Sequence, residues 1–124
     1  MTRTIIERPE EGEYLPYYGR YIALVPEGDI LETMVRQNES TMALLGSLSE
    51  MQGGHRYAPD RWSIKELVSH VSDAERIFAD RALRFARHDE TPLPGFEEND
   101  YVRNGGFDAF SLADIAKGLS LIHI

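Results

Sequence analysis

One histidine, His70, stands where a metal ligand could stand in a helical protein. Projected at ~100° per residue, it lies roughly 80° from the centre of the apolar stripe of its helix. Glu66 and Asp73 lie one turn before and one turn after it, so either carboxylate can approach the imidazole ring. A metal-bound histidine usually donates its second ring N–H to such a group. We therefore predict His70 as a metal ligand, with Asp73 and Glu66 as candidate acceptors for that N–H.

A single histidine does not complete a catalytic metal site, which needs about three protein ligands. The other histidines are His55, His88 and His123, and no two histidines lie three or four residues apart. No helix therefore supplies a histidine pair, and the other ligands would come from elsewhere. The alternative is a structural histidine that pairs with carboxylates of its own helix. Both interpretations stay open on spacing alone.

The remaining residue patterns exclude several classes of chemistry. The chain contains no cysteine, so a disulfide, a thiolate metal site and a cysteine nucleophile are all excluded. It also has no Gly-rich phosphate loop, GxSxG or HExxH motif. Two groups of charged residues could form a carboxylate cluster and an anion site, but a solvated face and ion pairing with neighbouring acids explain them better: Asp73, Glu75 and Asp80, and Arg81, Arg84 and Arg87.

Length and charge limit the possible partners. At 124 residues the chain has room for one modest core. The formal net charge of −8 opposes binding to nucleic acid or to an anionic membrane. The first residues lack a signal-peptide core, and no apolar run approaches the ~20 residues of a membrane span. We expect a cytoplasmic protein with a small-molecule substrate, and we include a homodimer among the expected assemblies.

The helix that carries His70 is expected over residues 63–88. Ser63 followed by Glu66 is a capping box, which marks its beginning. Asp89 and the proline-rich residues after it end the pattern. The apolar side chains form one continuous stripe at helical spacing: Ile64, Leu67, Val71, Ala74, Phe78, Ala82 and Phe85.

Two further helices should pack beside it. One is expected over residues 29–49, with Asp29 as its N-cap, and another begins near Ser111. Residues 1–26 are predicted to be an irregular, ordered arm whose tyrosines pack against the bundle. Residues 89–110 are predicted to be a long loop, of the kind that often lines a site, anchored by Phe96, Tyr101, Phe107 and Phe110.

The last six residues look foreign to the protein. Residues 119–124, LSLIHI, match the translation of CTG TCT CTT ATA CAC ATC, an end sequence used in transposase-based sequencing libraries. The third helix is also cut after about two turns. We therefore expect residues 1–124 to be a single, partial domain with a non-native tail over 119–124; the alternative is a natural apolar helix terminus.

The run 62–76, with its Trp62, Glu66, His70 and Asp73, resembles the DinB-like (YfiT-like) superfamily. Arg81, the segment 93–96 with Asp100-Tyr101, and the N-terminal segments 8–18 and 25–29 fit the same group. The resemblance spans nearly all of residues 5–118.

The resemblance implies an all-α, up-down four-helix bundle with a divalent-metal site of three histidines. His70 matches the ligand of the second helix. The other two belong to a fourth helix that is absent here, so about three helices of a truncated bundle are expected. The expected cofactors of the full-length protein are a divalent metal (Zn, Ni, Mn or Fe) and a low-molecular-weight thiol.

The resemblance also implies what such a protein does. Family members include thiol-dependent S-transferases and isomerases, together with many proteins described only as metal-dependent hydrolases. The expected function is metal-dependent thiol S-transfer or hydrolysis on a small molecule. The alternatives are a non-catalytic helical binding bundle with a structural histidine, and a fragment that is inactive as it stands.

Overall fold

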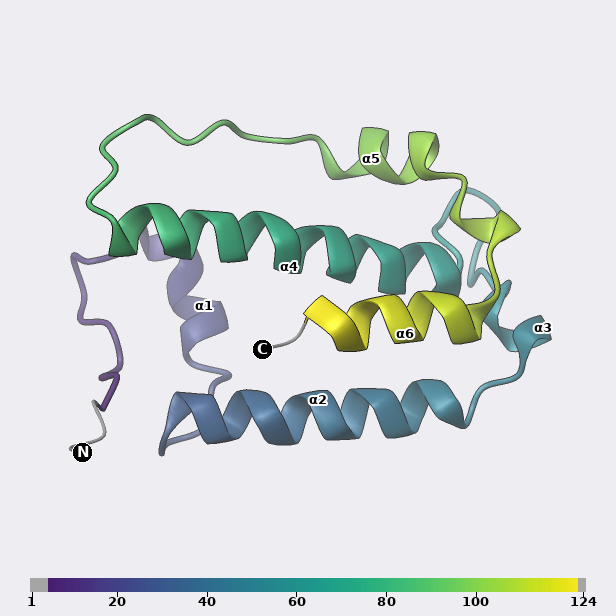
Figure 1. The fold of residues 1–124 in the computed structure, drawn as a ribbon, viewed down its shortest axis with the longest axis horizontal. Coiled ribbons are helices and arrows are strands. Elements are labelled where there is room, and N and C mark those ends of the chain that lie inside the picture. Colours follow the sequence, from purple (N-terminus) through teal and green to yellow (C-terminus); the bar gives the residue numbers. More distant parts are fainter. Residues whose placement is uncertain (1–4, 123–124) are drawn as a thin grey trace. The chain divides into compact units, whose positions relative to one another are not determined.

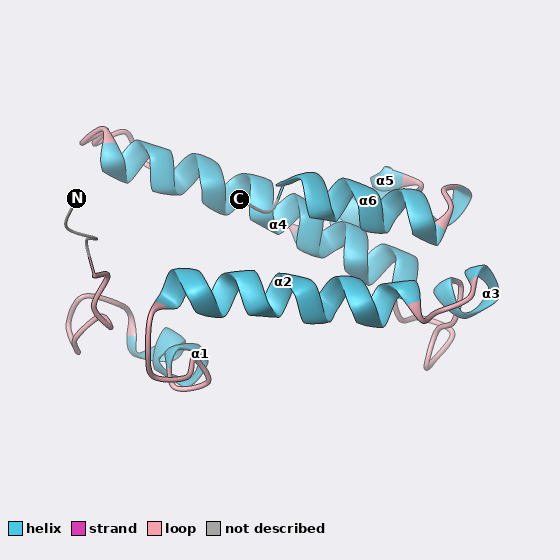
Figure 2. Cartoon of the chain, turned by 60° about the horizontal axis from the view of Figure 1, so that its bottom comes forward, coloured by secondary structure: helices cyan, strands magenta, loops and turns pink. Residues whose placement is uncertain are grey.

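The computed structural model describes residues 5–122, and every regular element among them is a helix (Figures 1 and 2). This confirms the all-α prediction, while the truncated four-helix bundle stays a prediction. The chain divides into two compact units, one up to Ser40 and one from Thr41 onward. Among residues 5–122, no helix combines the length and the hydropathy needed to span a membrane.

The first unit is held together by hydrogen bonds from its N-terminal segment. A 3₁₀ turn at Pro16–Tyr18 leads into the short helix α1, Gly19–Ile22. Arg8 donates hydrogen bonds to the carbonyl oxygens of Ile22 and Val25, at 2.6 and 2.7 Å. These bonds tie the N-terminal segment to the end of α1. The arm expected to be irregular thus contains a 3₁₀ turn and a short helix.

The tyrosines of this unit contact one another. The rings of Tyr17 and Tyr18 meet edge to face with centroids 5.2 Å apart, and the Arg20 guanidinium lies 4.2 Å from the centroid of the Tyr17 ring. Tyr17, Tyr18 and Tyr21 are each at least half exposed. The predicted packing of these tyrosines against the bundle stays a prediction.

Helix α2, Ile30–Gly46, begins in the first unit and ends in the second. The Asp29 carboxylate accepts the backbone N–H of Leu31 at 2.8 Å, as expected of an N-cap. The predicted span of 29–49 therefore agrees with the observed helix to within three residues.

The second unit is built around α4, Ile64–Ala86. Ser63 and Glu66 form the predicted capping box, with backbone-to-side-chain hydrogen bonds of 3.0 and 3.1 Å. The helix α6, Leu112–Ile122, packs along α4 (Figure 1). The short helix α3, Glu50–Gly53, lies at the beginning of α6.

The core of this unit joins three helices. Leu45, Val68 and Leu119 are at most 8% exposed and pack together. Burying such side chains stabilises a fold by roughly 1.5–3 kcal/mol each. The predicted non-native tail, residues 119–124, overlaps the end of α6, and its first residue, Leu119, belongs to this core. Residues 123 and 124 of that tail lie outside the described residues, and the tail assignment stays a prediction.

The beginning of α6 is capped from another helix. Ser111 Oγ accepts the Asp114 backbone N–H at 3.1 Å, as its position in the sequence suggests. The Glu50 carboxylate also accepts the backbone N–H groups of Leu112 and Ala113, at 2.7 and 3.2 Å. These hydrogen bonds lower the pKa of Glu50.

The structure corrects the expected loop over residues 89–110. It contains the helix α5, Glu98–Gly105, and a 3₁₀ turn, η2, over Phe107–Ala109. The Glu97 carboxylate caps α5 by accepting the Asn99 backbone N–H at 3.0 Å, and Gly106 ends the helix at φ +62°. Val102 of α5 is 3% exposed, so burial of one apolar side chain fixes this short helix.

The apolar stripe of α4 is only partly buried. Leu67, Val71, Phe78 and Phe85 are each more than a third exposed. The buried positions of the helix are Val68 and two serines, Ser69 and Ser72. The face that packs against α6 is therefore rotated from the centre of the predicted stripe toward smaller side chains, which allow a close approach of the two helices.

Candidate functional site

His70 lies between an aromatic ring and a carboxylate. The centroids of the His70 and Trp62 rings are 4.9 Å apart, with the planes tilted by 47°. His70 Nε2 is 3.7 Å from Oε2 of Glu98, a distance that suits an ion pair but exceeds a hydrogen bond. The imidazole is 20% exposed and the Glu98 side chain 54%. One ring nitrogen of a largely covered histidine thus points to an accessible oxygen donor.

Three elements position this group. Trp62 precedes the capping residue Ser63, and Ser63 is fully buried, so the capping box fixes where the indole stands. Glu98 is the first residue of α5, which packs against α4. The buried Val102 anchors α5 and thereby holds Glu98 near His70.

The two predicted N–H acceptors have other partners. Glu66 pairs with Arg56 and accepts the Ser63 backbone N–H. Asp73 lies 3.7 Å from a guanidinium nitrogen of Arg76. The structure therefore brings neither carboxylate to the His70 ring. Their role beside a metal-bound His70 stays a prediction.

Sequence reasoning missed Glu98. It follows the proline-rich connection after α4, so helical periodicity could not relate it to His70. The one available signal is that a long connection often lines a site. Trp62 belongs to the run that resembles the family, but its contact with the His70 ring depends on how the loop before α4 folds back on the helix.

Arg56 joins the loop before α4 to the rest of the unit. Its guanidinium pairs with Glu66 and Asp108 and donates to the carbonyl oxygen of Arg61 at 2.8 Å. Ser63 Oγ donates to Asp108 at 2.6 Å. This network fixes the loop that carries Trp62.

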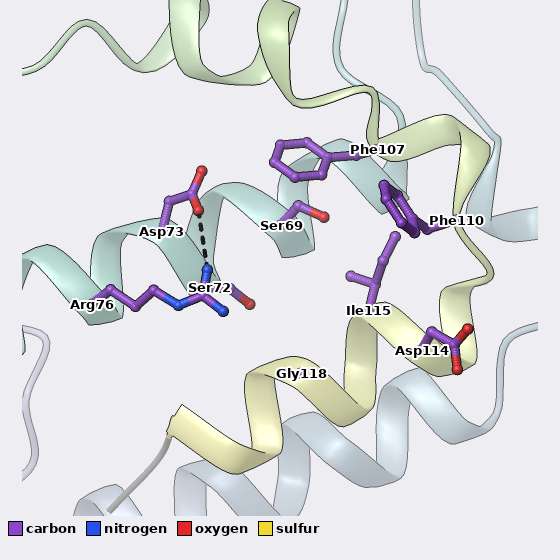
Figure 3. A pocket seen from close by; sticks show the side chains of 9 residues that line it. All are labelled: Ser69, Ser72, Asp73, Arg76, Phe107, Phe110, Asp114, Ile115 and Gly118. Carbon is purple, nitrogen blue, oxygen red and sulfur yellow. Dashed lines mark ion pairs between the residues drawn. The ribbon is translucent and has the colours of Figure 1, made fainter.

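Several cavities lie along α4, one of them between its later turns and residues 93–96. One has a volume of about 180 Å³ and is shown in Figure 3; Phe107 and Phe110 face Ser69 there, beside the ion pair of Asp73 with Arg76. His70 is not among its lining residues. Small-molecule sites usually measure about 300–1,000 Å³, so this cavity is small for a substrate.

The second cavity measures about 430 Å³, and His70 is not among its lining residues either. We call it the Trp62 cleft; its walls include Tyr57, Arg61, Trp62, Leu67, Glu98 and Asn99. It shares Trp62 and Glu98 with the surroundings of His70. A ligand in this cleft would therefore touch the two side chains that contact the imidazole.

The described residues do not by themselves form a metal site. Within residues 5–122, no three histidine, aspartate or glutamate side chains gather closely enough to hold an ion. His70 and Glu98 provide two donors where a catalytic site needs about three. His55 is an exposed loop residue at the cleft, and His88 is exposed at φ +53° after α4. His123 lies outside the described residues.

Comparison with known proteins identifies the family. The profile of the DinB superfamily matches residues 33–121, more than half of the chain. The match includes all of α4 and α5, which carry His70 and Glu98, and also the loop before α4, which carries Trp62. The chain has no significant match among curated proteins or among solved structures.

Proposed function

The chain belongs to the DinB superfamily, and on that basis we propose that His70 supplies one ligand of a divalent metal site. The observation that carries the proposal is the environment of His70. Its imidazole is 80% covered, and its Nε2 faces the Glu98 carboxylate at 3.7 Å. A nitrogen and an oxygen donor together suit Zn, Ni, Mn or Fe.

The remaining ligands would come from outside residues 5–122. His70 and Glu98 fit the ion as donors, while Trp62 packs against the imidazole and limits its rotation. A bound divalent ion would polarise a substrate or lower the pKa of a bound water or thiol. This chemistry supports the proposed activity, metal-dependent thiol S-transfer or hydrolysis on a small molecule.

A second candidate is a non-catalytic helical binding bundle in which His70 is structural. The same contacts favour it, because a histidine that packs on Trp62 and pairs with Glu98 already has a role in the fold. The two candidates differ in what removal of the imidazole does. Metal uptake depends on His70 only in the first.

The test is the metal content of the protein expressed from its native gene, measured after dialysis. Wild type is compared with His70→Ala and with His88→Asn. His88 is exposed, and asparagine tolerates its positive φ, so this variant is a matched histidine control. We expect wild type and His88→Asn to retain stoichiometric metal and His70→Ala to lose it.

Two outcomes contradict the proposal. Equal metal in wild type and His70→Ala removes His70 from the site, and wild type without metal supports the structural histidine. If the metal depends on His70, the same proteins are assayed for thiol transfer and for hydrolysis. Activity that survives loss of the metal would refute the metal-dependent mechanism even with the ligand assignment intact.

A further inference from the structure

We propose that the Trp62 cleft of the metal-free protein binds a small organic cation, such as an alkylamine. The cleft volume of about 430 Å³ is in the range of small-molecule sites. Its residues come from the loop before α4, the first turn of α4 and the first turn of α5. The site is therefore built by the fold of the second unit alone.

The walls offer both aromatic and aliphatic contacts. Trp62 and Tyr57 contribute rings, and Leu67 and Ile64 contribute aliphatic surface. An ammonium group is attracted to the face of an indole or phenol ring. Leu67 is 51% exposed, so an alkyl chain lying on it would remove apolar surface from water.

The charges of the cleft favour a cation. Glu98 is 54% exposed, and its ion-pair partner among residues 5–122 is His70, at 3.7 Å. Arg61 already lies 4.0 Å from the Asp60 carboxylate and 5.9 Å from the centroid of the Tyr57 ring. The Glu98 carboxylate therefore remains available to an ammonium group. The net charge of −8 also draws cations toward the protein.

The helix ends at the cleft do not reverse this preference. Helices α4 and α5 both begin here, and their N-termini would favour an anion. One amide in the first turn of each helix is already occupied, however. The Ile64 N–H donates to the His55 carbonyl oxygen at 3.2 Å, and the Asn99 N–H donates to the Glu97 carboxylate at 3.0 Å. Few backbone donors are left for an anionic ligand.

The test uses three probes of equal size and different charge: hexylammonium, hexanol and hexanoate. Each is titrated into protein freed of metal by chelation, at pH 7. Trp62 is the only tryptophan of the chain, so its fluorescence reports occupancy of the cleft. We expect saturable binding of hexylammonium at least about fivefold tighter than binding of hexanol or hexanoate.

Variants of Glu98 assign the charge preference. Glu98→Gln should weaken hexylammonium binding about fivefold and leave hexanol binding unchanged, because only the charge is lost. Glu98→Asp keeps the charge and should retain the preference for the cation. Glu90→Gln, at an exposed position that does not line the cleft, is the control and should bind like wild type.

Three results overturn the inference: equal affinity for all three probes, tighter binding of hexanoate, or no saturable binding of any probe. The first would show a merely apolar cleft, and the second would make it an anion site at Arg61. Because the protein is metal-free in this experiment, failure here is distinguishable from failure of the metal proposal, which is decided by metal content.

Discussion

Replacing Arg56 with methionine should destabilise the second unit far more than loss of an exposed ion pair would. Arg56 pairs with Glu66, whose side chain is 14% exposed, and with Asp108, which is 46% exposed. Stranding a buried charge costs about 3–5 kcal/mol, whereas an exposed pair contributes about 0–1 kcal/mol. Arg56 is itself 34% exposed, which places the loss between these limits, at about 2 kcal/mol.

The lost hydrogen bond from Arg56 to the Arg61 carbonyl adds about 1 kcal/mol. The expected total is therefore about 3 kcal/mol, a large share of the roughly 5–15 kcal/mol that stabilises a domain. The assay is urea unfolding at pH 7 followed by far-UV circular dichroism. Arg103→Met is the control, because Arg103 and Asp100 are more than half exposed; it should cost less than about 0.5 kcal/mol.

A double-mutant cycle with Glu66→Gln isolates the ion pair. Glutamine keeps the capping box with Ser63 and removes only the charge. The double variant should be less destabilised than the sum of the single variants, by about 1.5 kcal/mol. Additive effects, or a cost for Arg56→Met no larger than that for Arg103→Met, would refute the conclusion that this network fixes the loop.

Three further predictions concern α6 and its cap. The N–H groups of Leu112 and Ala113 hold the pKa of Glu50 below 4.5, so this stabilisation is present above pH 4.5 and is lost as pH falls through the lower, folded-state pKa. Glu50→Gln should therefore lower the urea midpoint at pH 7 and make that midpoint fall less steeply as the pH drops below 4.5. An unchanged pH dependence below pH 4.5 would contradict this. Leu112→Ala should lower the free energy of unfolding by about 2–5 kcal/mol, because Leu112 is 2% exposed. Leu121→Ala, at a 76% exposed position, should change it by less than about 0.5 kcal/mol. Equal losses for the two variants would contradict the observed packing of α6. Gly53→Ala should cost about 1–3 kcal/mol in the same assay, since its Cβ would lie 3.2 Å from Leu112 Cβ and from Lys65 Cε, and a neutral effect would show that these side chains yield.

The sequence was sufficient for the main helices because their signals are local. The capping box of Ser63 and Glu66 and the N-cap of Asp29 act within a few residues, and the structure reproduces both. Helix α5 escaped prediction because it is short and its buried surface depends on one side chain, Val102. One buried apolar residue does not produce the helical periodicity of apolar residues from which a helix is predicted.

The surroundings of His70 were less predictable. Helical spacing predicts that Glu66 and Asp73 can reach the His70 ring, but it does not show which other cations compete for these carboxylates. Arg56 comes from a separate loop and pairs with Glu66, and Arg76 pairs with Asp73 on the same helix. The carboxylate nearest His70 comes from α5, whose place beside α4 is set by tertiary packing.

The central claim is that His70 coordinates a divalent ion, and the most direct test observes its ring nitrogens. The protein expressed from its native gene, with ¹⁵N-labelled histidine, is titrated with Zn²⁺ and followed by long-range ¹H–¹⁵N correlation spectra, with His70→Ala and His88→Asn used for assignment. We predict that one His70 ring nitrogen moves to the chemical shift of a metal-bound imidazole as Zn²⁺ reaches saturation, while the His88 signals stay unchanged. His70 signals that remain those of a free imidazole in the metal-saturated protein would contradict the claim.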